Sequence, residues 1–232
     1  MGRVVIVAGA SSGMGRATAQ ALAAAGATLV LSARTADALA AVADDIVRVG
    51  GTASIYAGDA VEAAAAAGVV EATLDRHGRV DALVNTVGTN IPRRRLDELT
   101  PESWRELIDV NLTAAFNLTQ AVVPALRANG GQIVHVSSSA AKRADQSGVG
   151  YQASNAGVAA LAHGTMEEER ANNIRVSVIY PGMTDTRFVF HRPTPTPPEV
   201  LAKALQPDDV AAACLFVLGL PARAWVPELL LY

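Results

Sequence analysis

The stretch GYQASNAG, residues 150–157, contains the side chains that most directly suggest chemistry. Tyr151 is followed four positions later by Asn155, and residues at this spacing lie on one face of a helix. A lysine at the second position would place an ammonium beside the phenol, whereas Asn155 offers only an uncharged amide. Tyr151 is therefore a candidate proton donor or acceptor in catalysis, without an adjacent cation at residue 155.

A second candidate site is the turn AGASSGMG, which follows the apolar run RVVIV. Gly9, Gly13 and Gly15 let backbone N–H groups approach a pyrophosphate, whose charge is favoured at the N-terminus of a helix. The turn follows a predicted strand and precedes a predicted helix, which is the context that such a site requires. The sequence therefore predicts a dinucleotide cofactor.

Short apolar runs alternate with longer alanine-rich helical patterns, and these elements must position both sites. We expect strands in RVVIVAG, ATLVLSA, ASIYAGD, VDALVNTVG, GQIVHVSSS and RVSVIYPG, and an edge strand in ARAWVPELLLY. We expect helices over residues 16–25, 37–49, 61–76, 101–128 and 151–171. Because the strands are apolar throughout, both faces of the sheet should be buried. The prediction is a doubly wound parallel sheet of Rossmann type in a three-layer α/β/α architecture.

The composition, with 50% hydrophobic and 18% charged residues, is that of a folded chain. We expect a single domain over residues 1–232. The segment RPTPTPPEV, residues 192–200, should lack regular secondary structure because of its prolines, and it forms part of a short substrate loop at about residues 187–205.

The composition also argues against several classes of partner. A net charge of -3 provides no basic field for nucleic acid, and the cluster Arg93–Arg95 is interpreted as a solvated charge run or, alternatively, as a means of steering an anion. No apolar stretch has the length of a membrane span, and the only cysteine, Cys214, favours a reducing compartment. We therefore expect a cytoplasmic protein without a catalytic metal, because no histidine, cysteine and carboxylate cluster has the required spacing.

The motifs, taken in order, resemble those of compact single-domain short-chain dehydrogenases/reductases. The glycine turn has their G-x-x-x-G-x-G spacing, and Ser138 precedes Tyr151 by thirteen residues. AGDA, NTVG, VNLTAAFNL and IYPGMTDT stand where that family has its other motifs. Ala8, Thr86 and Val87 depart from the family pattern, and Asn155 stands at the position of the family's active-site lysine.

The resemblance implies a role for each matched residue. Tyr151 would exchange a proton with the substrate oxygen, Ser138 would polarise that oxygen, and Asn111 would help a water chain reach the site. Asn155 would contact the nicotinamide ribose. The implied cofactor-binding residues are Gly9, Ser11, Ser12, Gly13, Met14, Gly15, Ala33, Arg34, Asp59, Ala60, Asn85, Gly88, Tyr151, Asn155, Pro181, Gly182, Thr184 and Thr186.

The end of the second predicted strand selects between the two nicotinamide cofactors. An acid there would hold the ribose hydroxyls of NAD and repel a 2′-phosphate, but this chain has Ala33 followed by Arg34. A guanidinium suits a phosphate, so we expect NADP(H) rather than NAD(H). Arg34 could alternatively stack on the adenine.

The asparagine at residue 155 changes the expected chemistry. A cation about 4 Å from a phenolate, at an effective dielectric constant near 20, contributes about 4 kcal/mol, or about three pKa units. Without it Tyr151 should stay protonated, which suits carbonyl reduction better than alcohol oxidation. Lys142 on the following loop could substitute for the missing cation, although a solvated lysine is the alternative, and His163 lies too far along the helix.

Two hypotheses for the function remain open. The first is an NADP-dependent reductase of a small neutral ketone or aldehyde, impaired at Asn155, and the second is an inactive NADP-binding protein with a regulatory or assembly role. The neutral substrate is expected because the residues predicted to border it are small or apolar and include no paired arginines. As in similar proteins, a homodimer or homotetramer should form through the two helices of the site, which we expect to expose Ala114, Ala115, Ala159 and Ala160.

Overall fold

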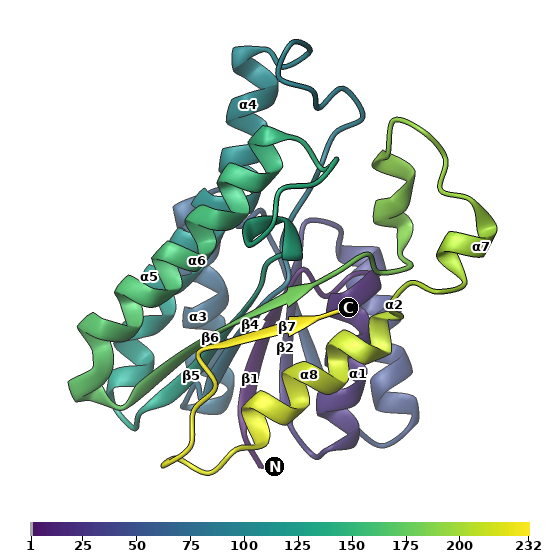
Figure 1. The fold of residues 1–232 in the computed structure, drawn as a ribbon. Coiled ribbons are helices and arrows are strands. Elements are labelled where there is room, and N and C mark those ends of the chain that lie inside the picture. Colours follow the sequence, from purple (N-terminus) through teal and green to yellow (C-terminus); the bar gives the residue numbers. More distant parts are fainter. Residues whose placement is uncertain (1) are drawn as a thin grey trace.

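The computed structural model describes residues 2–232, which build one seven-stranded sheet (Figure 1). Every neighbouring pair of strands is parallel, and the strand order is β3-β2-β1-β4-β5-β6-β7. The strands are β1 (Val4–Ala8), β2 (Thr28–Ala33), β3 (Thr52–Ala57), β4 (Ala82–Asn85), β5 (Gly131–Val136), β6 (Ile174–Pro181) and β7 (Glu228–Leu231). The predicted parallel sheet is confirmed.

The central strands are apolar throughout because helices cover both faces of the sheet. All residues of β1 and β4 are buried, whereas the edge strand β3 is partly exposed along its length. Three long helices cover each face (Figure 1). They are α1 (Gly13–Ala24), α2 (Ala36–Arg48) and α8 (Pro207–Gly219) on one face, and α3 (Ala63–His77), α5 (Ala114–Arg127) and α6 (Val149–Glu169) on the other.

The helix predicted over residues 101–128 consists of three consecutive segments. These are α4 (Pro101–Ile108), a π-helical turn (Asp109–Thr113) and α5. A π turn inserts an extra residue, so the residues after it lie on a different face from the one that a regular helix would give them. The prediction that Ala114 and Ala115 are exposed is wrong, because both are fully buried, and Phe116 is the exposed residue instead.

The proline-rich segment also differs from its prediction. Residues 198–201 form α7 (Pro198–Leu201), a single helical turn, so regular secondary structure is not excluded there. Pro198 occupies the first turn of this helix, where its missing N–H would have no partner within the helix in any case. Three short 3₁₀ segments complete the elements: Ser139–Ala141, Arg170–Asn172 and Arg187–His191.

The order of the strands fixes where a ligand can bind. The chain builds β1, β2 and β3 outward in one direction and then places β4 on the other side of β1. The connections that leave the carboxyl ends of β1 and β4 therefore separate, and ligands of open parallel sheets bind in the resulting crevice. Both candidate sites of the sequence lie at this edge of the sheet.

None of the helices in residues 2–232 is long and apolar enough to cross a membrane. Within the same residues, no group of three or more histidine, cysteine or carboxylate side chains is arranged to hold a metal ion.

Candidate active site

Two adjoining cavities open at the carboxyl edge of the sheet. The outer cavity, of about 390 Å³, lies over the glycine turn and the end of β2. The inner cavity, of about 180 Å³, contains the Tyr151 region. The residues that line both are Met14, Thr86, Val87, Gly88, Thr186 and Phe188. A ligand bound along the outer cavity would therefore reach the inner one.

The glycine turn leaves room for a ligand at the N-terminus of α1. Gly9 and Gly13 have positive φ angles of 81° and 51°, which favour glycine. A Cβ atom on Gly15 would lie only 2.2 Å from the carbonyl oxygen of Gly9. Ser12 precedes the helix without a side-chain capping hydrogen bond, and the first turn contains no acid. The turn therefore fits a pyrophosphate, whose charge the uncapped N–H groups would stabilise.

The end of β2 presents an exposed cation to the outer cavity. The Arg34 side chain is 74% exposed, and its only ion pair among residues 2–232 is a 4.0 Å contact with Asp59. Asp59 also accepts a hydrogen bond from the backbone N–H of Val61, at 3.1 Å. Ala33 contributes no charge. The guanidinium is thus available for an anion at the position where the sequence predicts a 2′-phosphate.

Tyr151 lies on the first turn of α6 and faces the inner cavity, half-buried beside Phe188 with ring centroids 5.9 Å apart. Burial raises the pKa of its phenol above the ordinary value of 10, and the nearby Asp145 acts in the same direction. Hydrogen bonds with the Ser138 and Asn155 side chains, and the charge of Arg94, lower the pKa but do not outweigh burial. The phenol is therefore protonated at neutral pH, as expected from the sequence.

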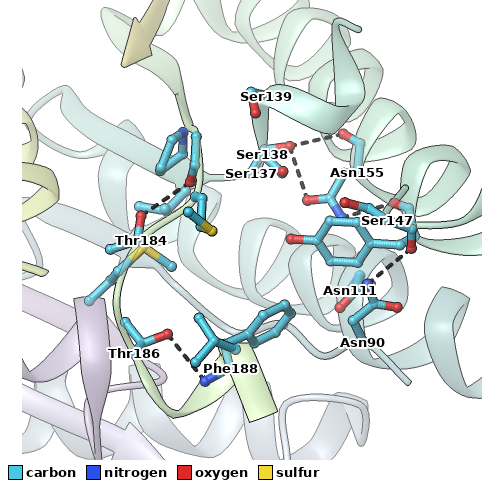
Figure 2. Close-up of a pocket in the computed structure, with 18 of the residues that line it drawn as sticks. Asn90, Asn111, Ser137, Ser138, Ser139, Ser147, Asn155, Thr184, Thr186 and Phe188 are labelled. Atoms are coloured by element: carbon cyan, nitrogen blue, oxygen red, sulfur yellow. Dashed lines mark hydrogen bonds between the residues drawn. The ribbon is translucent and has the colours of Figure 1, made fainter. Parts of the chain in front are cut away.

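Asn155 lines the inner cavity, but most of its hydrogen-bonding capacity is used within the protein. Its Nδ2 donates to the Tyr151 carbonyl at 2.9 Å. Figure 2 shows two hydrogen bonds of the Ser137 hydroxyl, to the side-chain oxygen of Asn155 at 3.2 Å and to its carbonyl oxygen at 3.1 Å. Nδ2 carries a second hydrogen, but the Asn155 side chain also hydrogen-bonds the Tyr151 phenol, so little of its capacity remains for a ligand. The Ser137 contact was not expected from the sequence.

Asn111 lies in the π turn and connects three segments of the chain. Its Oδ1 accepts from the backbone N–H of Thr89 at 2.6 Å, and its Nδ2 donates to the Thr89 carbonyl and to Ser154 Oγ. Ser154 in turn donates to the Tyr151 carbonyl. Asn111 thus holds the loop after β4 against the helix of Tyr151, and its role in a water chain stays a prediction.

Asn85 is the one predicted site residue that lines neither cavity, and it is 3% exposed. Its Oδ1 accepts from the backbone N–H of Val87, and its Nδ2 contacts His135 Nδ1 at 3.2 Å. It can therefore affect the cofactor only through the Thr86–Gly88 segment, which lines both cavities.

The other predicted residues lie around the two cavities. Gly9, Ser11, Ser12, Gly13, Met14, Gly15, Ala33, Arg34, Asp59, Ala60, Gly88 and Thr186 line the outer one. Asn111, Ser138, Tyr151, Asn155, Pro181, Gly182 and Thr184 line the inner one, with Met14, Gly88 and Thr186 shared. The fold thus brings together residues that are up to 177 positions apart in the sequence, from Gly9 to Thr186.

Lys142 does not replace the missing cation. Its Nζ donates to Glu228 on β7 and lies 4.7 Å from the centre of the Tyr180 ring, and it does not line the inner cavity. His163 pairs with the same carboxylate at 3.0 Å. The end of β7 reaches the cavity wall, because the N–H of Gly182 donates to the Leu231 carbonyl at 2.8 Å.

Arg94 is the residue that the sequence interpretation missed. Arg93 and Arg95 are exposed as expected, but Arg94 is only 6% exposed and lines the inner cavity together with Arg192. The description of this run as solvated is therefore wrong for its middle residue. A neutral substrate was expected because the sequence showed no paired arginines near the substrate. Arg94 and Arg192 contradict the reason for that expectation.

Comparison with known proteins agrees with this geometry. Residues 3–194 match the short chain dehydrogenase family. The chain is 31% identical over 223 residues to the 3-oxoacyl-(acyl-carrier-protein) reductase FabG of Thermotoga maritima, covering 93% of this chain and 90% of that protein.

Two solved structures are similar over nearly the whole chain. A metagenomic short-chain oxidoreductase in complex with NADP has a TM-score of 0.86 and 34% identity, covering 99% of this chain and 96% of that one. An alcohol dehydrogenase of the archaeon Thermococcus sibiricus, complexed with 5-hydroxy-NADP, has a TM-score of 0.89 and 30% identity, covering 98% and 95%. The protein belongs to the short-chain dehydrogenase family of oxidoreductases.

Proposed function

We propose that the protein reduces a small ketone or aldehyde to the alcohol with NADPH. The observation that carries this proposal is the junction of the two cavities. The outer one is lined by a glycine turn suited to a dinucleotide, and the inner one presents the protonated phenol of Tyr151 beside Ser138.

The residues of the outer cavity fit the proposed cofactor. The glycine turn would hold the pyrophosphate, and Arg34 would hold the 2′-phosphate that distinguishes NADP from NAD. When bound, NADPH would supply the hydride. Two structurally similar proteins were solved with NADP or a derivative of it, which supports this choice of cofactor.

The inner cavity supplies the proton. In the proposed reaction, the Tyr151 O–H donates its proton to the carbonyl oxygen of the substrate, while the Ser138 hydroxyl donates a hydrogen bond to the same oxygen. Phe188 packs beside the phenol, with ring centroids 5.9 Å apart. Each cycle then requires a new proton for Tyr151, which residue 155 cannot help to supply because its amide does not titrate.

We propose that Asn155 stands in place of a lysine and slows this cycle. Its amide is bound to the Tyr151 carbonyl and to Ser137, and it adds no charge to the site. Retention of the Ser138–Tyr151 pair favours a weakened enzyme over a protein that only binds NADP.

The test is the consumption of NADPH with a panel of ketones and aldehydes. The unaltered chain should turn over slowly, and Asn155→Lys should raise kcat. Tyr151→Phe should lower the rate by about a hundredfold or more, the usual contribution of a general acid. Binding of NADPH without turnover of any carbonyl by the unaltered chain would refute the proposed activity.

We also propose that the protein assembles as a homodimer or homotetramer through α5 and α6. Phe116 on α5, Val149 on α6 and Trp104 on α4 are each 40–45% exposed, which leaves apolar surface for a second copy to cover.

A further inference from the structure

A cation is buried in the wall of the inner cavity. Arg94 lies on the loop after β4, and its backbone packs tightly against Gly148, where a Cβ atom would lie 2.4 Å from the Arg94 carbonyl oxygen. One terminal nitrogen of its guanidinium donates to the carbonyl of His191. Its Nε is buried without a hydrogen-bond partner. The side chain is therefore held in place but is only partly satisfied.

The charge of Arg94 is only partly offset by the protein, through the nearby carboxylate of Asp145. Within residues 2–232, neither Arg94 nor Arg192 forms an ion pair with a carboxylate. Asp145 lines the same cavity, but its Oδ1 accepts from the backbone N–H of Ser147. Burial lowers the pKa of Arg94 and the charge of Arg192 adds to this effect, whereas Tyr151 and Asp145 oppose it without outweighing burial. Burying a charge without an ion-pair partner costs free energy. A bound anion would therefore stabilise the Arg94 guanidinium.

The cofactor does not account for this cation. The outer cavity has two arginines of its own, Arg34 and Arg187, at its lining. Arg94 and Arg192 line only the inner cavity, together with Tyr151 and Ser138. An anion beside Arg94 would therefore belong to the molecule whose carbonyl faces the phenol.

We propose that the preferred substrates are short oxo acids, whose carboxylate binds at Arg94 and Arg192 while the carbonyl faces Tyr151. The position of the carbonyl at Tyr151 rests on the proposed carbonyl reduction, whereas the carboxylate site at Arg94 and Arg192 does not. A guanidinium binds a carboxylate through two parallel hydrogen bonds, and Arg94 has terminal N–H donors besides the one bonded to the His191 carbonyl. The small volume of the inner cavity favours a short chain.

The first test compares each oxo acid with its methyl ester, because the two differ mainly in charge. For 2-, 3- and 4-oxo acids of about four to six carbons, kcat/KM for at least one acid should exceed that for its ester by about ten- to a hundredfold, the usual effect of hydrogen bonds to a charged group. Arg94→Gln should lower kcat/KM for the acid at least about tenfold more than for the ester, and Arg94→Lys should retain part of the preference. Arg93→Gln, at the exposed neighbour, is the matched control and should retain the preference fully.

The second test does not depend on turnover. Calorimetric titration of the protein, with and without NADPH, should detect binding of pentanoate but not of methyl pentanoate, and Arg94→Gln should abolish it. If neutral ketones are reduced but no acid is preferred or bound, the anion site is refuted and the reductase stands. If pentanoate binds through Arg94 but no carbonyl is reduced, the anion site stands and the reductase is refuted. An equal loss for acid and ester in Arg94→Gln would also overturn the anion site, because it would place the effect of Arg94 on Tyr151 instead.

Discussion

At the scale of single residues, Tyr151 is the side chain on which the chemistry depends. Burial and Asp145 raise the pKa of its phenol, whereas Ser138, Arg94 and Asn155 lower it by less. The phenol therefore begins each cycle as an acid, and the site is suited to giving up a proton rather than taking one.

This gives the two directions of the reaction different pH profiles. Reduction needs protonated Tyr151, so its kcat/KM should be flat between pH 6 and 9 and fall only above the raised pKa of the phenol. Oxidation of the alcohol needs the phenolate, so its kcat/KM should rise about tenfold per pH unit over the same range. Steady-state rates in both directions test this, and a plateau of the oxidation rate below pH 9 would contradict it.

Arg34 should determine the choice of cofactor. Arg34→Gln should weaken NADPH binding by about ten- to a hundredfold, because it removes a charge-assisted hydrogen bond to the 2′-phosphate, and should leave NADH binding nearly unchanged. Titrations followed by nucleotide fluorescence would measure both affinities. Arg105→Gln, which alters an exposed arginine outside both cavities, is the control. Equal weakening of NADPH and NADH would indicate stacking on the adenine instead.

The sequence predicted the site residues better than it predicted the charge around them. Ser138 and Tyr151 have a diagnostic spacing, and the fold brings them together in the inner cavity. Arg94 has no such signal, because its burial depends on Gly148 and on the His191 carbonyl, which are distant in the sequence. A run of three arginines gives no local sign that the middle one is buried.

At the scale of elements, the turn from β1 into α1 is the most constrained connection. Gly15 lies so close to Gly9 and Thr86 that any side chain would collide with backbone or with Thr86 Oγ1. The turn and the first helical residues therefore form one rigid element that is shaped for a ligand.

Substitution of Gly15, compared with substitution of Gly164, tests whether the close contacts of Gly15 are what exclude a side chain. Gly15→Ala should abolish NADPH binding and destabilise the fold by about 1–3 kcal/mol, the usual cost of overpacking. Gly164→Ala on α6 has no atom within 4 Å of the new Cβ and should be neutral or stabilising by up to about 1 kcal/mol, because alanine favours a helix. Thermal melts and NADPH titrations of both variants measure this, and retained binding in Gly15→Ala would contradict it.

The order of the elements was predictable, but one irregularity was not. Apolar runs and glycines marked the strands and their ends, since both arise from local sequence. The π turn has no such mark, because DVNLT continues the helical pattern. It is stabilised by contacts of Asn111 with Thr89 and Ser154, which only the folded chain provides.

At the scale of the whole molecule, His135 connects the sheet to the helical layer. It is fully buried on β5, between Asn85 on β4 and Thr119 on α5. The Thr119 hydroxyl donates its hydrogen to the Ala115 carbonyl, so it accepts a hydrogen bond from His135. The ring proton of His135 is therefore on Nε2. His135 Nδ1 then accepts from Asn85, and the ring is neutral.

Burial of this neutral ring should make the fold sensitive to acid. The pKa of His135 is lowered from 6.5 to about 4, so the folded state stays neutral where the unfolded state gains a proton. The stabilisation from neutral His135 is complete above pH 6.5. As the pH falls toward 4 it is lost, which lowers the free energy of unfolding by about 3 kcal/mol in total. Denaturant unfolding between pH 7 and 4 should show this loss in the unaltered chain and in His163→Gln but not in His135→Gln. Equal losses in all three would contradict it.

The exposed apolar residues should report on assembly. Phe116→Asp on α5 should shift the protein toward monomers in light scattering, because it places a charge in the proposed interface. Val47→Asp on α2 changes a residue of similar exposure on the opposite face of the sheet, and it should leave the assembly intact. An unchanged mass for Phe116→Asp would exclude this surface.

The position of β7 has a practical consequence for handling the protein. Leu231 contacts Gly182 in the wall of the inner cavity, so a purification tag or fluorescent fusion added after Tyr232 would emerge beside the site. Gly2, where the described chain begins, lies beside the start of β1 at the amino edge of the sheet (Figure 1), and it lines neither cavity. Tags for kinetic work belong there, and a label after Tyr232 would instead serve as a reporter of ligand entry.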